Sequence, residues 1–549
     1  MRSLEQALIE HELITLRVIG EWWELDLAGM EKNEAVDVLA RALTRLDMQQ
    51  ELAFLPQEES AALQDLVSQG GRAAVAAFNR LYGEVRLMGP GRMEREEPWL
   101  DPISPLEALW YRGFLYRAFD DTAEGVLEFY YLPQELLDQF PSDNIEEDEQ
   151  ESAPLLDPVE PPEGALSKGL VNSVDDLTTL LSAALQQFGE GKEKAAGNDF
   201  LLDQNPDRKS LLLNLAAEQG WLREEESGLK PTRSAVDWLK KGREAQLFEL
   251  ADAWSKSSWN DLCHTPGLIC DGHNWQNDPI LARTAVLDVL PQTDHWYSLA
   301  DLVDLIRNTD PDFQRPDGSY DTWYVRDAQT NDYLSGFDSW DQVEGRLIRF
   351  LITGPMCWLG ITIISGPADD ALFRLSDLGL RWLGGEQPQD QEDKIPIVVH
   401  PDASILVAHN ADRYLRFQVA RIAELEIVDG RKTYAYRLTP ASLTEAGDQG
   451  ITIERLLRFL SQASGSSLPK SLQRAVERWS ERGVEGRLES VVVLRVSDAE
   501  ILQKLRNNPK TRDFIGEFLG DLAVTIKVGQ WRQFRAACAQ LGLFIDDLS

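Results

Sequence analysis

The residues best suited to metal chemistry lie in one short stretch, CHTPGLICDGH. It contains Cys263, His264, Cys270 and His273. Thiolates and imidazoles are the ligands of tetrahedral zinc sites. However, the C-x6-C-x2-H spacing fits no common zinc finger, and free cysteines are usually small core residues. The sequence therefore favours a loop between two domains over a zinc site, and we expect no cofactor.

Motifs for catalysis are absent from the sequence. GEGKEKAAG holds a Gly-Lys pair, but it lacks the upstream strand and the hydroxyl residue that a nucleotide-binding P-loop requires. There is no G-x-S-x-G, no H-E-x-x-H and no dinucleotide fingerprint. We therefore expect a protein that is not an enzyme.

A row of basic residues gives the chain its clearest candidate binding surface. The stretch LPKSLQRAVERWSERG has a cation at every fourth position, namely Lys470, Arg474, Arg478 and Arg482. An apolar stripe lies beside the row and consists of Leu468, Leu472, Val476 and Trp479. This spacing predicts a helix with one buried face and one cationic ridge that could follow a phosphate backbone.

Four more basic residues could extend this ridge. They are Arg413, Arg416, Arg431 and Lys432, of which the first two lie in a predicted helix and the last two in a predicted hairpin. The alternative is an ordinary solvated helix face on which Glu477 and Glu481 neutralise their neighbours. The sequence leaves both interpretations open.

The net charge restricts where nucleic acid could bind. The chain has 54 Lys and Arg against 92 Asp and Glu, a net charge of −38. Residues 395–549 have 21 basic and 19 acidic residues, so the net charge of −40 lies in residues 1–394. An acidic surface repels phosphates. We therefore expect any contact with DNA to lie in the C-terminal part and the front of the chain to dock proteins.

A length of 549 residues predicts several domains. The clearest boundary is SDNIEEDEQESAPLLDPVEPPEG, which has nine acidic residues, four prolines and no Lys or Arg. We predict an α+β multidomain protein in five parts. These are a helical N-terminal domain ending in a possible winged helix (1–140), an acidic, Pro-rich disordered linker (141–168), winged-helix-like domains (169–268 and 269–390) and a C-terminal α/β domain (395–549).

One local pattern recurs along the chain and underlies the winged-helix prediction. An apolar strand residue is followed by Thr or Ser and then by a short helix in segments 228–242, 372–385 and 435–450. Thr and Ser are good helix N-caps, and Ser298 before LADLVDLIRN is another. In the first two segments this strand-to-helix pattern comes after a helical stretch. That order is expected in a winged helix, where a wing strand leads into a closing helix.

Residues 395–549 resemble the N-terminal domain of XPB-type helicases and the helicase-associated proteins that carry this domain. The matching motifs are VVHPDASILV, YRLTPASLTEAGDQGIT, an LP that opens a helix ending in Trp479, and VVVLRVSDAEILQKL with DLAVTIKVGQWRQFRAACAQLGL. The resemblance implies an α/β module that senses distorted DNA and docks a partner with a similar module, in DNA repair or transcription. The motor domains are missing, so helicase and ATPase activity are not implied.

These observations predict a non-catalytic, DNA-associated adaptor that works with a helicase or nuclease supplied in trans. The alternative is a protein-interaction scaffold that does not contact nucleic acid. The apolar run 350–368 is interrupted by Gly354-Pro355, Gly360 and Gly366-Pro367, which favours a buried helix end and strands over a membrane span. With four cysteines and no signal-peptide pattern, we expect a cytoplasmic protein.

Overall fold

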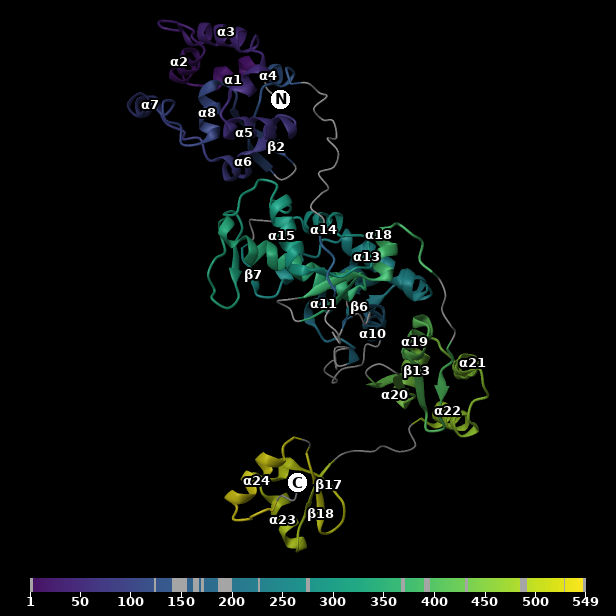
Figure 1. The fold of residues 1–549 in the computed structure, drawn as a ribbon. Helices are drawn as coiled ribbons and strands as arrows, with labels where there is room; N and C mark the ends of the chain where they lie inside the picture. Colours follow the sequence, from purple (N-terminus) through teal and green to yellow (C-terminus); the bar gives the residue numbers. More distant parts are fainter. Residues whose placement is uncertain are drawn as a thin grey trace. The chain divides into compact units, whose positions relative to one another are not determined.

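A computed structural model describes most of the chain as helices and small antiparallel sheets (Figure 1). The described residues are 3–122, 125–140, 156–160, 167–168, 172–185, 200–225, 228–272, 277–366, 371–389, 395–429, 433–483, 491–527 and 529–546. They form two compact units. One comprises Met1–Val398, Ser404–Arg437 and Ala463–Gly465, and the other comprises Val399–Ala403, Leu438–Gln462 and Ser466–Ser549. The mixed α/β content agrees with the predicted α+β class.

The first 140 residues combine helices with a three-stranded sheet in the order β1-β3-β2. The elements are α1 (Leu4–Glu10), α2 (Leu13–Trp22), α3 (Lys32–Leu43), α4 (Met48–Phe54), α5 (Gln57–Ser68), β1 (Arg72–Ala74), α6 (Val75–Tyr82), α7 (Pro90–Glu96), α8 (Pro105–Arg112), β2 (Tyr116–Thr122), β3 (Gly125–Tyr131) and α9 (Gln134–Leu137). Helix α8 and the hairpin β2-β3 lie near the end of this part, where the sequence predicts a possible winged helix. Their interpretation as a winged helix stays a prediction.

The middle of the chain is built around a second core, in which Trp238, Trp254 and Trp340 are fully buried. Its strands form a sheet in the order β4-β10-β11-β8 and the pairs β5-β6 and β7-β9. Its first elements are β4 (Ser167–Lys168), α10 (Ser173–Leu185), α11 (Pro206–Glu218), β5 (Leu222–Glu225), β6 (Gly228–Pro231), α12 (Arg233–Leu239), α13 (Arg243–Ser255), η3 (Leu262–His264) and β7 (Leu268–Cys270). The later ones are α14 (Pro279–Asp288), β8 (Tyr297–Ser298), α15 (Leu299–Thr309), β9 (Val325–Asp327), η4 (Phe337–Ser339), η5 (Asp341–Gly345), α16 (Arg346–Thr353), α17 (Pro355–Trp358), β10 (Thr362–Ser365), β11 (Leu372–Leu375) and α18 (Asp377–Leu383).

Part of the predicted linker packs onto this middle core. Leu156 is buried in the core, and the Val159 amide donates to the Trp296 carbonyl at 2.8 Å. Lys168 of β4 pairs with Ile364 of β10. Residues 141–155 and 161–166 lie outside the described residues, so their disorder stays a prediction. The linker prediction therefore extended too far at its C-terminal end, because apolar Leu156 and Val159 find partners in the body that follows.

The predicted helix caps are confirmed. Thr232, Ser298 and Ser376 each accept a hydrogen bond from a backbone amide in the first turn of α12, α15 and α18. Thr439 makes a full capping box with Ser442 at the start of α20 (Pro440–Asp448). These caps need only short-range geometry, so the sequence identifies them well.

The apolar run near residue 350 folds into the short pieces that its Gly and Pro residues predict. Helix α16 ends at Thr353, Pro355 opens α17, and strand β10 follows. In the part of the chain that the structure describes, no helix combines the length and apolar character needed to cross a membrane.

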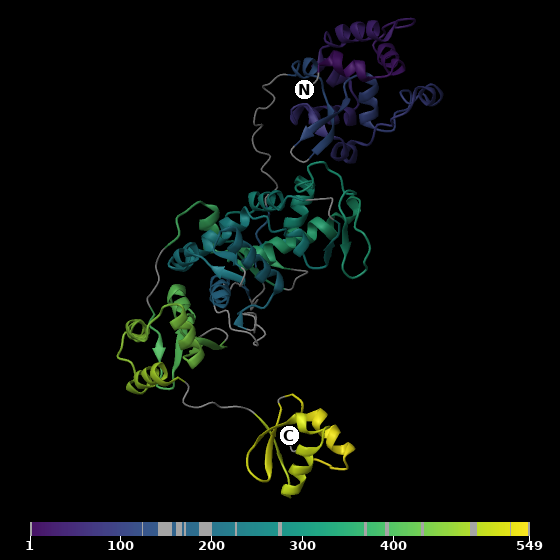
Figure 2. The same cartoon turned by 180° about the vertical axis from the view of Figure 1, so that it is seen from behind.

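The C-terminal part alternates short strands and helices (Figure 2). Its elements are β12 (Val398–Val399), β13 (Ser404–Ala408), α19 (Arg413–Ala420), β14 (Glu424–Asp429), β15 (Thr433–Arg437), α20, α21 (Ile453–Ser464), α22 (Lys470–Arg482), β16 (Val492–Arg495), α23 (Ala499–Asn507), η7 (Arg512–Phe514), β17 (Ile515–Phe518), β18 (Ala523–Ile526) and α24 (Trp531–Gln540). Strand β15 pairs antiparallel with both β13 and β14, and β18 lies between β16 and β17. The winged-helix and XPB-type assignments stay predictions.

Candidate functional site

Helix α22 has the two faces that its sequence predicts. Leu472 and Val476 are buried, as is Leu468 just before the helix, whereas Trp479 is half-buried. Pro469 is the N-cap of the helix, and Gly483, at φ 69°, ends it in a backbone conformation that glycine adopts at little cost. Burial of the apolar stripe fixes the rotation of the helix and therefore fixes which side chains face water.

All four cations of the row on α22 are exposed: Lys470, Arg474, Arg478 and Arg482. Among the described residues, none of the four forms a salt bridge. Glu477 and Glu481 are exposed as well. The row extends over about 18 Å along the helix, because each residue advances the helix by about 1.5 Å. We call these four residues the α22 cationic face; their charges are accessible to an anionic partner.

Arg413 and Arg416 lie in a different environment. Their side chains are 1% and 3% exposed, at the contact of α19 with α10 and α13. Arg413 Nε donates to Gln246 Oε1 at 2.8 Å. Arg416 donates to Thr179 Oγ1 at 3.3 Å and to the Asp175 carbonyl, and its guanidinium lies 4.0 Å from the Tyr434 ring centroid. Both arginines are therefore committed to internal contacts.

This burial corrects the prediction that Arg413 and Arg416 extend an exposed ridge. The prediction assumed that α19 packs through its apolar residues alone, and Val419 and Ile422 are indeed buried. The same helix also packs against α10, more than 200 residues earlier in the chain, and that contact covers the arginine side. Arg431 and Lys432, the other predicted extension, lie outside the described residues.

Two adjacent carboxylates on α10, those of Asp175 and Asp176, form ion pairs with the basic groups around them. Arg243 donates to Asp175 through two nitrogens, at 2.8 and 3.0 Å, and His409 Nε2 lies 3.5 Å from the same carboxylate. Arg208 pairs with Asp176 at 2.5 Å. Burial raises the pKa of Asp176, and the charge of Arg208 opposes that shift.

Burial also lowers the pKa of His409, although the Asp175 carboxylate opposes this shift. We call Asp175, Asp176 and their partners the α10 carboxylate cluster. Reasoning from the sequence missed this cluster. Its only signal was a pair of aspartates in a stretch without other charged residues, where burial demands charged partners.

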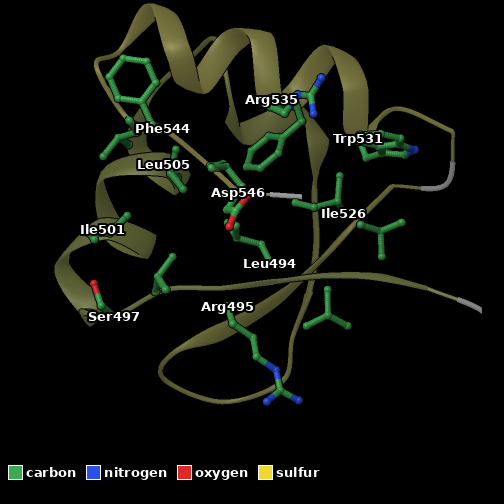
Figure 3. Close-up of a pocket in the computed structure, with 16 residues that line it drawn as sticks. Leu494, Arg495, Ser497, Ile501, Leu505, Ile526, Trp531, Arg535, Phe544 and Asp546 are labelled. Carbon is green, nitrogen blue, oxygen red and sulfur yellow. The ribbon is translucent and has the colours of Figure 1, made fainter. Parts of the chain in front are cut away.

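A pocket of about 680 Å³ lies in the segment 491–546 (Figure 3). Its walls are mainly apolar and include Leu494, Ile526 and Trp531, while Arg535 and Asp546 supply polar groups. Phe544 on its border is 93% exposed. Val492 and Val493 of the sheet-edge strand β16 also line the pocket, and both are exposed.

In the described part of the Cys/His stretch, His264 contacts other groups. His264 Nδ1 lies 2.8 Å from Asp207 Oδ1, and its ring stacks on Trp259 at 4.2 Å. Among the residues that the structure describes, no three His, Cys, Asp or Glu side chains are close enough to hold a metal ion. His273 lies outside these residues, so its part in a zinc site is untested.

Comparison with known proteins finds a family match for the segment that carries α22. No curated protein matches the chain. A protein-family model described as a helicase conserved C-terminal domain matches residues 397–519, which include α19, the α22 cationic face and strand β16. This part of the chain is therefore a helicase-related domain.

Proposed function

We propose that this protein is a non-catalytic, helicase-associated adaptor that contacts nucleic-acid phosphates through the α22 cationic face. The observation that carries the proposal is the row of four exposed cations within the helicase-related segment, which form no salt bridge with any other described residue. We further assign this segment to the XPB-type N-terminal family, on the motifs found in the sequence. The enzyme that acts on the nucleic acid would be a helicase or nuclease supplied in trans.

The chemistry of the row supports contact with phosphates more than contact with bases. Three of the four residues are arginines, whose guanidinium groups bind phosphate oxygens in a bidentate manner. Side chains spaced four residues apart follow one side of a helix. Contacts of this kind give binding that depends little on sequence and strongly on salt. The acidic front of the chain, with a net charge of −40, would repel the same phosphates and confine binding to this face.

Charge reversal on this face tests the proposal. In the full chain, Arg474→Glu with Arg478→Glu should weaken binding to labelled single-stranded and duplex DNA, measured by fluorescence anisotropy. The slope of log K against log salt should fall by about 2, because two phosphate contacts are lost. The matched control, Lys504→Glu with Arg532→Glu, makes the same change in net charge at exposed positions of α23 and α24.

If both double variants weaken binding equally, the effect is one of net charge and the α22 cationic face is not the site. If the folded wild-type chain does not bind at low salt, the DNA-associated proposal fails.

The alternative proposal is a scaffold that contacts proteins only. It is favoured by the apolar pocket beside strand β16, since exposed apolar clusters and unpaired strand edges are common features of protein-binding surfaces. A folded chain that fails to bind DNA at low salt would support this scaffold function.

A further inference from the structure

A cavity of about 290 Å³ lies in the N-terminal part of the chain, and every residue that lines it lies between Ala7 and Glu128. It is surrounded by elements that Figure 1 labels α1, α2, α8 and β2. His11 comes from the turn after α1, and Tyr116 begins strand β2. We call this cavity the His11 pocket.

Two buried polar groups on the wall of the His11 pocket are uncommitted. His11 is 7% exposed and Tyr116 is 1% exposed, and their ring centroids lie 5.3 Å apart. Among the residues that the structure describes, neither His11 Nε2 nor the Tyr116 hydroxyl has a hydrogen-bond partner. A buried polar group without a partner costs about 1–3 kcal/mol. The protein therefore gains stability when a ligand supplies the partners that these two groups lack.

The charges around the pocket favour an uncharged ligand. Burial lowers the pKa of His11 to about 4 and raises the pKa of Tyr116, so both side chains are uncharged at neutral pH. Arg86 and Arg117 also line the pocket, and each is already paired with a glutamate. Moving a charged ligand from water to a site without an uncommitted opposite charge is unfavourable.

The remaining walls favour an aromatic ring. Trp110 of α8 meets the His11 ring edge-on at 4.7 Å. Met88 and Met93, which also line the pocket, pack with Tyr111 in one apolar cluster. Indole rings and thioether sulfurs both make favourable contacts with aromatic rings. A volume of about 290 Å³ is near the lower end of the range for ligand pockets, so it suits one ring or two fused rings.

We propose that the His11 pocket binds an uncharged aromatic heterocycle of one or two rings, which hydrogen-bonds to His11 Nε2 and to the Tyr116 hydroxyl. A neutral imidazole nitrogen and a phenol hydroxyl can each pair with a donor or an acceptor, according to the ligand. The protein thus has a small-molecule site in the acidic front of the chain, in addition to the α22 cationic face.

Ligand-observed NMR on the full chain tests this proposal with three probes. Benzimidazole is uncharged at neutral pH and carries one N–H donor and one nitrogen acceptor on two fused rings. Indene has the same shape without polar atoms, and benzoate is an anionic ring. We expect saturation transfer to benzimidazole at millimolar concentration, with at least tenfold weaker binding of indene and of benzoate. The proposal is overturned if benzimidazole does not bind, as for a pocket that holds only water, or if either control binds as tightly.

Two conservative substitutions separate binding from stability. Tyr116→Phe removes only the hydroxyl and should weaken benzimidazole binding about three- to tenfold, because one hydrogen bond is lost. It should not lower the urea midpoint, since that hydroxyl has no partner among the described residues. In the control, Tyr130→Phe, the lost hydroxyl donates to Asn79 at 2.9 Å away from the pocket. This variant should lower the urea midpoint and keep the wild-type affinity.

His11→Phe keeps a ring at the second position and removes Nε2, so it should weaken binding by a similar factor. Circular dichroism checks that each variant is folded. Equal affinities of wild-type protein, Tyr116→Phe and His11→Phe for benzimidazole would place the probe elsewhere and overturn the proposal. An equal loss of affinity in Tyr116→Phe and Tyr130→Phe would also overturn it.

Discussion

Arg283 shows how a single buried charge organises the middle core. Its guanidinium is fully buried, pairs with Asp261 at 2.6 Å and donates to the carbonyls of Trp254, Ser257 and Trp259. Asp261 in turn accepts from the Trp254 indole at 3.1 Å. Burial raises the pKa of Asp261, and the charge of Arg283 opposes the shift. One side chain thus satisfies three backbone carbonyls and one carboxylate.

Removal of this guanidinium should destabilise the middle core. We expect Arg283→Met to lower the free energy of unfolding of this core by about 3–5 kcal/mol, because it leaves a buried carboxylate without its partner. Urea denaturation followed by tryptophan fluorescence measures the change. The control, Arg92→Met, removes one partner of the exposed ion pair with Glu96 and should leave the urea midpoint unchanged. An equally small effect of Arg283→Met would contradict the structural role.

His11 gives the N-terminal part a sensitivity to pH. Its ring is buried and packs edge-on against Trp110 at 4.7 Å. Burial, with a smaller contribution from Lys32, lowers its pKa from 6.5 to about 4. The folded state therefore holds His11 neutral, whereas the unfolded chain protonates it below about pH 6.5. The contribution of buried, neutral His11 to the free energy of unfolding is fully present above pH 6.5 and is lost as the pH falls toward 4.

The expected loss from His11 between pH 7 and pH 5 is about 2 kcal/mol of unfolding free energy. His11→Gln should reduce this pH dependence, as measured by urea denaturation at both pH values. His295→Gln, at an exposed position, is the control and should keep the wild-type dependence. If the two variants show the same dependence on pH, His11 is not its source.

At the scale of the element, the sequence predicts features that depend on nearby residues. The caps at Thr232, Ser298, Ser376 and Thr439 were recognisable because each needs only an amide two or three residues later. Helix α22 was predictable for a similar reason, since its apolar stripe and its cationic row share one period. The position of the candidate site on α22 therefore followed from local pattern alone.

Helix α19 marks the limit of this reasoning. Its sequence gives an amphipathic helix with two arginines beside the apolar stripe, and a solvated position for them is the simplest expectation. Their actual partners, Asp175, Thr179 and Gln246, lie more than 150 residues away in the chain. No periodicity within the helix encodes a contact at such a distance. The α10 carboxylate cluster escaped prediction for the same reason.

At the scale of the whole molecule, the contact of α19 with α10 determines which fragments report on function. A fragment of residues 395–549 lacks α10, so Arg413 and Arg416 would become exposed. We expect this fragment to bind DNA about tenfold more tightly than a fragment of residues 438–549, because Arg413 and Arg416 make new phosphate contacts. Anisotropy at matched salt measures the difference.

Both fragments lack the acidic front of the chain, so its repulsion does not enter this comparison. Arg413→Ala with Arg416→Ala in the longer fragment should abolish the gain. Equal affinity of the two unsubstituted fragments would show that the arginines stay covered or do not reach phosphates.

The packing of α10 also bears on how the protein is made. From Ser173 to Ser182 every residue of this helix is buried, and Arg416, which bonds to the Asp175 carbonyl, follows 241 residues later. At about 5–20 residues per second, a ribosome needs roughly 10–50 s to synthesise that interval. Throughout this time the side of α10 that α19 will cover is open to solvent and to chaperones. The nascent chain thus completes this core only after α19 has been synthesised.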